Sequence, residues 1–158
     1  MEENNLAKLS HQEIALGLTA RVLQESNKIK CYITGKIAAL QAYLSESSSY
    51  AKKFAELSEI IAGAEKYIEM LRSLVEALEK DELDLAQCVE QLIESMQNGT
   101  ATPADADQGL NNIICKVTSL KYVCRTAQKN INISYSRYEH AFEKHKMFYK
   151  CFSNILNS

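Results

Sequence analysis

The sequence contains few of the residues that interrupt helices. Among its 158 residues are one proline and five glycines, and tryptophan does not occur. Sheet proteins and turn-rich enzymes use more proline and glycine, because these residues form tight turns. Apolar residues make up 46% and charged residues 24% of the chain, which is ordinary for a folded domain. The composition therefore favours a single domain of long helices.

Long apolar runs are also missing. No stretch approaches the roughly 18 apolar residues that a transmembrane helix needs. The first residues are acidic and polar, which argues against a secretory signal peptide. The five cysteines are an odd number without CxxC spacing, as is typical of free thiols in a reducing compartment. We therefore expect a cytoplasmic protein, with export without a cleaved signal peptide as the alternative.

A seven-residue apolar repeat extends from Phe54 to Met96, and twelve of its thirteen positions are apolar. One column contains Phe54, Ile61, Ile68, Val75, Glu82, Val89 and Met96, and the other contains Leu57, Ala64, Leu71, Leu78, Leu85 and Leu92. A narrow apolar seam of this kind has to be buried against other helices. The repeat predicts a helix over about 50–97 that packs in a bundle.

Glu82 is the charged residue within this repeat. A buried carboxylate without a partner is costly, so we expect one of three arrangements. The helix is interrupted near residues 80–84, the carboxylate reaches solvent, or it pairs with a basic residue of the C-terminal helix.

An N-terminal helix is predicted over about 10–45. Ser10 and Glu13 have the spacing of a capping box, in which each side chain bonds the backbone N–H of the other residue. Residues 1–8 are then a loose segment that precedes the helix.

A C-terminal helix is predicted over about 103–156. Thr102 is a suitable N-cap and Pro103 a suitable first residue, while Gly99 has the conformational freedom to end the preceding helix.

A turn at 46–49 is predicted from the serines of residues 45–49, because serine hydroxyls bond nearby backbone groups. Short connections favour antiparallel neighbours. The expected fold class is therefore all-α, an elongated antiparallel three-helix bundle with coiled-coil character, with 1–158 as a single helical domain. The alternative is a continuous long helix over 10–97 in a dimeric coiled coil.

Charge is segregated along the chain although the net charge is only −2. Residues 1–53 contain seven Lys/Arg and five Asp/Glu, residues 54–107 contain three and thirteen, and residues 108–158 contain eight and two. The acidic middle helix is expected to lie against the basic C-terminal helix, which would neutralise both.

No motif in the sequence indicates catalysis. Glu139, His140, Glu143 and His145 are close in sequence, but the chain has no Glu-x-x-His pair, no HExxH motif and no zinc-ligand spacing. The cysteines have no arrangement with histidine that would activate a nucleophile. We expect a protein that is not an enzyme and that has neither a metal nor a cofactor.

Aromatic residues are concentrated near the C-terminus, where six of the twelve lie within eighteen residues. These six residues, which form the predicted partner-binding surface, are Tyr135, Tyr138, Phe142, Phe148, Tyr149 and Phe152. Aromatic side chains beside positive charge are common anchors of protein interfaces. The alternative is that the six form the aromatic end of the core.

The sequence favours a non-enzymatic helical-bundle protein that acts by protein–protein interaction as a scaffold, an adaptor, or an assembly or secretion-associated subunit. Its partner would be another protein bound through helix–helix contacts, including a second copy in a homo-oligomer. The alternative is nucleic-acid or anionic-membrane binding through the basic, aromatic C-terminal helix. Nucleic acid is the less favoured partner, because the net charge is negative.

Overall fold

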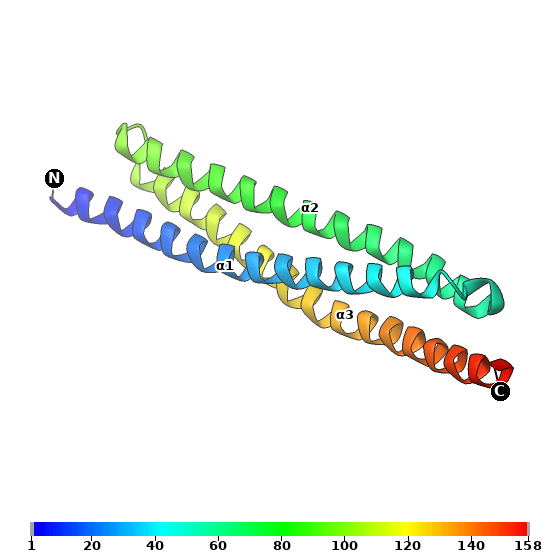
Figure 1. The fold of residues 1–158 in the computed structure, drawn as a ribbon. Helices are drawn as coiled ribbons and strands as arrows, with labels where there is room; N and C mark the ends of the chain where they lie inside the picture. The colour runs from blue at the N-terminus through cyan, green and yellow to red at the C-terminus, as the bar shows by residue number, and fades with distance from the viewer. Residues whose placement is uncertain (1, 158) are drawn as a thin grey trace. The chain divides into compact units, whose positions relative to one another are not determined.

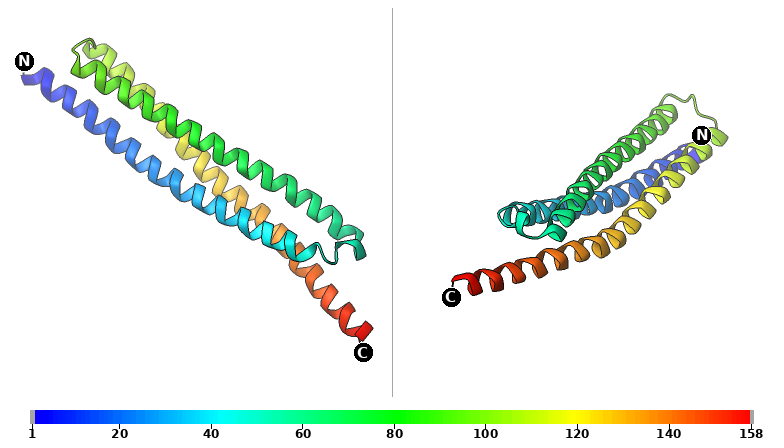
Figure 2. Two further views of the ribbon diagram at one scale, coloured as in Figure 1. Left: turned by 45° about the horizontal axis from the view of Figure 1, so that its top comes forward. Right: turned by 90° about the vertical axis from the view of Figure 1, so that its right-hand side faces the viewer.

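The computed structural model describes the backbone of residues 2–157 and the side chains of residues 11–155. It contains α1 (Glu2–Ser47), the short 3₁₀ helix η1 (Ala51–Lys53), α2 (Ala55–Gln97) and α3 (Pro103–Asn157). Two short connections join the long helices (Figures 1 and 2). The described residues contain no strand, and the fold class is confirmed as an all-α three-helix bundle.

The chain forms two compact units, and each contains a segment of every long helix. Unit 1 comprises Met1–Lys30 and Glu76–Thr126, and unit 2 comprises Cys31–Val75 and Ala127–Ser158. In each unit α1 and α3 run parallel, and α2 runs antiparallel to both (Figure 1). The expectation that residues 1–158 form a single helical domain stays a prediction.

The N-terminal boundary of α1 differs from the prediction. The backbone is helical from Glu2, so residues 2–8 are not a loose lead-in, and Ser10 lies inside the helix rather than at its start. The predicted start of the helix near residue 10 is therefore wrong, while the side chain of Ser10, on which the capping box depends, lies outside the described residues. The physical reason is that no glycine or proline lies before Ser10, so nothing in the sequence forces the helix to begin there.

α1 and α2 are separated by residues 48–54, and the continuous helix over 10–97 is wrong. The serines act as predicted, since Ser48 Oγ donates to Ser45 O at 2.9 Å and Ser49 Oγ donates to Glu46 O at 3.2 Å. Tyr50 is buried and fixes the connection to the core. α2 begins at Ala55 rather than near residue 50, because η1 and one extended residue precede it.

The connection between α2 and α3 matches the prediction closely. Gly99 has a φ of 68°, a left-handed conformation that favours glycine and ends the helix. Thr102 and Asp105 then form a reciprocal cap. Asp105 N donates to Thr102 Oγ1 at 3.1 Å, and Thr102 N donates to Asp105 Oδ2 at 3.1 Å.

The apolar repeat of α2 forms the seam of the bundle. All six residues of its second column are buried, and the first column is buried or half-buried throughout. The helix continues without interruption through residues 80–84, so the break considered there does not occur.

α1 follows a seven-residue repeat of its own. One column of this repeat is buried along its whole length and contains Thr19, Ser26, Ile33, Leu40 and Ser47. Three of its members are small and polar, so a search for apolar spacing does not detect the column. The regular burial of these Thr and Ser residues was therefore not predicted from the sequence.

Candidate interaction surface

Two of the predicted partner-binding residues belong to the core of unit 2. Tyr135 and Phe142 are buried, and the Phe142 ring stacks on Tyr43 with a centroid separation of 5.3 Å. Lys36 Nζ lies 4.0 Å from the centroid of the Tyr135 ring, a cation–π contact. These two aromatic residues hold α1 against α3.

Two further aromatic residues of α3 are half-buried and stacked on a partner within unit 2. Tyr138 stacks on Tyr67 of α2 at 5.3 Å, and Tyr149 stacks on Tyr50 at 4.3 Å. Gly63 permits the first contact, because a Cβ at this position would lie 3.2 Å from Tyr138 Oη. Both rings already have aromatic partners.

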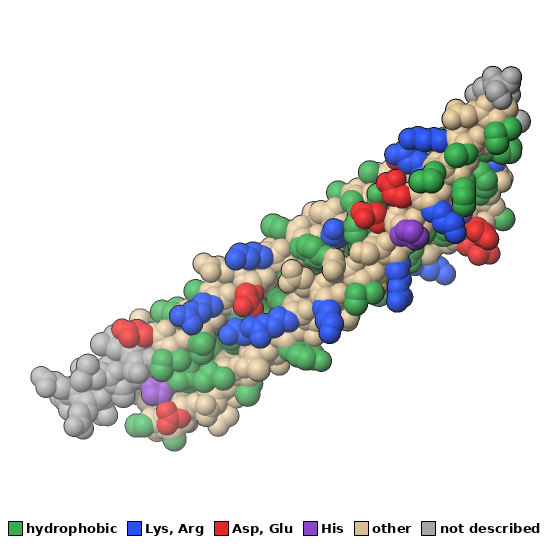
Figure 3. Space-filling view, turned by 90° about the horizontal axis from the view of Figure 1, so that it is seen from below, with side chains coloured by type: hydrophobic (Ala, Val, Ile, Leu, Met, Phe, Trp, Pro, Cys, Tyr) green, Lys and Arg blue, Asp and Glu red, His purple; other side chains and the backbone are tan. Residues whose placement is uncertain are grey.

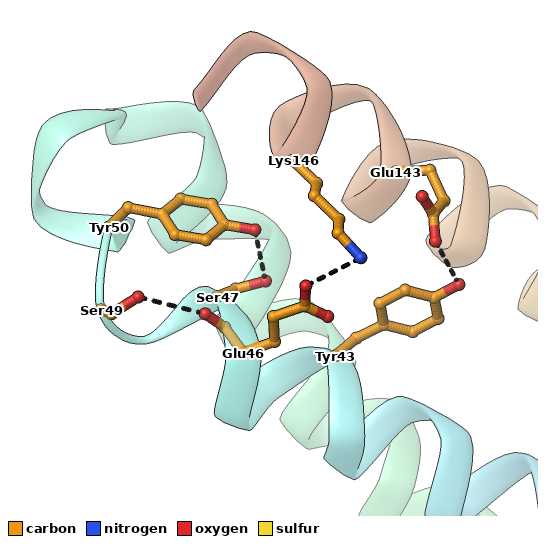
Figure 4. A network of polar contacts seen from close by, with 7 residues as sticks. All are labelled: Tyr43, Glu46, Ser47, Ser49, Tyr50, Glu143 and Lys146. Atoms are coloured by element: carbon orange, nitrogen blue, oxygen red, sulfur yellow. Dashed lines mark hydrogen bonds and ion pairs between the residues drawn. The ribbon is translucent and has the colours of Figure 1, made fainter. Parts of the chain in front are cut away.

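A network of polar contacts links the C-terminal part of α1 to α3 (Figure 4). Tyr43 Oη donates to Glu143 Oε1 at 2.8 Å, and Lys146 Nζ forms an ion pair with Glu46 Oε1 at 2.8 Å. The hydrogen bond and charge of Glu46 raise the pKa of Lys146. Burial, reinforced by the Glu143 carboxylate, raises the pKa of Tyr43 well above its usual value of 10.

Two other tyrosines of unit 2 also have raised pKa values. Burial, followed by the hydrogen bond with Glu139, raises the pKa of Tyr135 to about 12. Burial likewise raises the pKa of Tyr67, against a smaller opposing effect of a hydrogen bond with Ser134. Both hydroxyls are therefore held in their neutral form in the folded chain.

His145 is a buried residue that the sequence did not place in the core. Its Nδ1 lies 2.9 Å from Ala141 O, so Nδ1 carries a proton, because only an N–H can donate to a carbonyl. Its Nε2 lies 3.8 Å from Glu56 Oε2. The ring also makes edge contacts with Phe54 and Phe148.

The exposed part of the predicted surface is smaller and shifted toward the C-terminus. Phe148 and Phe152 are 49% and 44% exposed, while Met147, which was not predicted, is 65% exposed. Together with the exposed Cys151 they form a stripe on one side of α3, which we call the α3 patch. Hydrophobic side chains gather at this end of the molecule (Figure 3).

The α3 patch borders a basic hollow. This open hollow of about 620 Å³ is lined by His140, Glu143, Lys144, Lys146, Met147 and Lys150. Lys144 Nζ lies 5.7 Å from the Phe148 ring centroid. Among the described side chains, Lys144 and Lys150 have no carboxylate within 4 Å. The hollow therefore presents uncompensated positive charge beside apolar side chains.

The expected neutralisation of α2 by α3 is wrong. Of the ion pairs within residues 11–155, one, between Glu56 and His145, connects these two helices. The other pairs link α1 to α3, α1 to α2, or neighbouring residues within α2. The helices pack through their apolar seams, which turns most of their charges toward solvent. Acidic and basic surfaces consequently remain separate.

Unit 1 contains a second polar cluster. Glu82 Oε2 accepts a hydrogen bond from Lys30 Nζ at 2.8 Å, with both side chains less than one-fifth exposed. Its partner thus lies on α1, and the expectation of a partner on the C-terminal helix is wrong. The reason is that Lys30 lies one turn beyond the buried Ser26, on the side of α1 that faces α2.

Cys124 lies beside this cluster and has no feature of a reactive thiol. Burial and the nearby Glu25 raise its pKa. The Ser26 hydroxyl has a smaller effect, which lowers the pKa. A raised pKa and burial disfavour the thiolate, which is the nucleophilic form.

Two further kinds of site are absent from the described residues. Among residues 11–155, no group of three or more His, Cys, Asp or Glu side chains converges on a position for a metal ion. Within the helices as described, no segment has the length and hydropathy of a membrane span. Comparison of the chain with known protein families, curated proteins and solved structures finds no match.

Proposed function

We propose that this chain is a non-enzymatic helical-bundle protein that acts by binding another protein at the C-terminal end of α3. The observation that supports this proposal is the α3 patch, where Met147, Phe148 and Phe152 are exposed beside the basic hollow. Exposed Met and Phe side chains are enriched at protein interfaces, where a few large side chains contribute most of the binding energy. This geometry supports a scaffold or adaptor role.

Binding of nucleic acid through α3 has less support. Stacking on bases requires free aromatic faces, but Tyr138 and Tyr149 already stack within unit 2 and Tyr135 is buried. The basic residues of this segment also alternate with Glu139 and Glu143. An apolar patch beside lysines is better suited to binding the surface of another protein than to binding nucleic acid.

A photocrosslinking experiment in the native cell tests the proposal. A benzophenone amino acid replaces Met147 in the full chain, and the matched control carries it at Met70, an exposed residue of α2. We expect a discrete protein adduct from position 147 that is absent from position 70. Adding Phe148→Glu and Phe152→Glu should remove the adduct. The same adducts from both positions, or none from either, would contradict the proposal.

A further inference from the structure

The acidic surface of α2 resembles the α3 patch in pattern and has the opposite charge. Leu83 is 59% exposed at the centre of a stripe of exposed acidic residues, which we call the α2 stripe. The stripe consists of Glu76, Glu79, Leu83, Glu90 and Glu94. Their spacing of three, four and seven residues places them on one side of the helix.

The carboxylates of the α2 stripe are not neutralised within the chain. Among the described side chains, none of its four glutamates has a cation within 4 Å. On α3, Met147 is exposed between Lys144 and Lys150, which lie one turn before it and one turn after it. The α2 stripe is therefore predominantly acidic, with Lys80 one turn before Leu83, and the surface around Met147 is predominantly basic, with Glu143 one turn before Met147.

We infer that the partner of the α3 patch is a second copy of this chain, bound through its α2 stripe. This inference rests on the proposed function and names the occupant of its site. Charge complementarity identifies the occupant, because the stripe supplies carboxylates for Lys144 and Lys150 and an exposed leucine for the apolar patch. The open hollow beside Met147 has room for a side chain of this size.

The contact is heterologous, since it joins two different surfaces. A bound pair still presents one free stripe on one copy and one free patch on the other, so assembly continues into a ring or an open chain. A net charge of only −2 does not oppose this assembly. Because acidic and basic residues lie on different segments of the chain, their charges determine which surface of one copy meets which surface of the next.

Charge reversal separates this inference from other accounts of the patch. Sedimentation velocity of the full chain over a range of concentrations should show reversible association that weakens at least tenfold between low and high salt. Lys144→Glu with Lys150→Glu should abolish it, and so should Glu79→Lys with Glu90→Lys. Lys52→Glu with Lys66→Glu is the matched control, because these exposed lysines lie outside both surfaces.

Mixing the two charge-reversed variants provides the decisive measurement. Neither should associate alone, because each presents two surfaces of the same sign. An equimolar mixture should associate again, since the acidic patch of one variant meets the basic stripe of the other. Circular dichroism confirms that each variant is folded, and all four positions are exposed.

Two results would overturn the inference. One is a wild-type chain that remains monomeric at every concentration, and the other is association that persists in both variants or fails to return on mixing. A monomeric chain that still gives an adduct with a different protein from position 147 would retain the proposed function and reject self-assembly. Loss of that adduct as well would reject both.

Discussion

Units 1 and 2 contain segments of the same three helices but have different interiors. Eleven of the twelve aromatic residues lie in unit 2, while the twelfth, Tyr122, is exposed on unit 1. Unit 1 contains eight Lys/Arg and thirteen Asp/Glu, whereas unit 2 contains ten and seven. Their formal charges are therefore −5 and +3.

The two units also differ in whether their buried polar atoms have hydrogen-bond partners. Among the described side chains, the buried oxygens without a hydrogen-bond partner all lie in unit 1, and they are Thr19 Oγ1, Glu25 Oε2, Ser26 Oγ and Glu82 Oε1. In unit 2 the hydroxyls of Tyr43 and Tyr50 have partners. An unpaired buried polar atom costs about 1–3 kcal/mol. The comparison indicates that unit 2 is the more stable part of the bundle.

The largest effect is expected at Phe142, which is 1% exposed and stacks on Tyr43. Phe142→Ala should lower the free energy of unfolding by about 3–5 kcal/mol, because it removes a buried ring and leaves a cavity. Urea denaturation measures this loss. Phe148→Ala, at an exposed position six residues away, should cost less than about 1 kcal/mol. Equal losses would place Phe148 in the core and remove it from the α3 patch.

Glu82→Leu tests the ion pair of unit 1. From the sequence alone this change is expected to be neutral or stabilising, but the structure reverses the expectation because Lys30 would lose its carboxylate. We expect a loss of about 1–3 kcal/mol, reduced from the value for a fully buried pair by partial exposure. The double variant Lys30→Met with Glu82→Leu should recover wild-type stability. A neutral single variant would show that the pair is not structural.

High pH should act on unit 2 through its tyrosines. The pKa values of Tyr43, Tyr67 and Tyr135 are raised above their usual value of 10 in the folded chain, so the folded state holds protons that the unfolded state releases. Stability is then fully present below pH 10 and falls between about pH 10 and 12. Ultraviolet absorbance of tyrosinate, measured with helicity, should show these groups ionising as the helices unfold. Ionisation of all eight tyrosines near pH 10 with the helices intact would contradict the burial of these hydroxyls.

The smallest effects concern single buried hydroxyls. Thr19→Val should stabilise the chain by about 1 kcal/mol, since Thr19 Oγ1 is buried without a partner. Ser47→Ala, in the same column of α1 but in unit 2, should destabilise by about 0.5 kcal/mol, because Ser47 Oγ lies 3.5 Å from Tyr50 Oη. Thermal melts compare the two. Changes of the same sign would remove the distinction between the units.

Much of the fold follows from local sequence signals. The apolar repeat of α2, the cap at Thr102 and the serine-rich turn depend on neighbouring residues, and each can be read without tertiary information. The α1 column containing Thr19, Ser26 and Ser47 cannot be read in this way, because small polar residues have no hydrophobic periodicity.

The candidate surface was only partly accessible to prediction. Aromatic density indicates this segment of α3, but it does not distinguish the buried Phe142 from the exposed Phe148. That distinction depends on where α1 and α2 lie against the helix. The pairing of Lys30 with Glu82 is likewise a tertiary contact between residues 52 positions apart, which neither local sequence specifies.

Native-state hydrogen exchange tests the difference between the units most directly. Backbone amides in the core segments of unit 2, near residues 33–40, 64–71 and 131–142, should exchange most slowly. Those of unit 1, near residues 15–29 and 78–92, should exchange about tenfold faster or more, because local opening there releases fewer aromatic contacts and hydrates unpaired polar atoms. Equal protection in both units, or slower exchange in unit 1, would contradict the account.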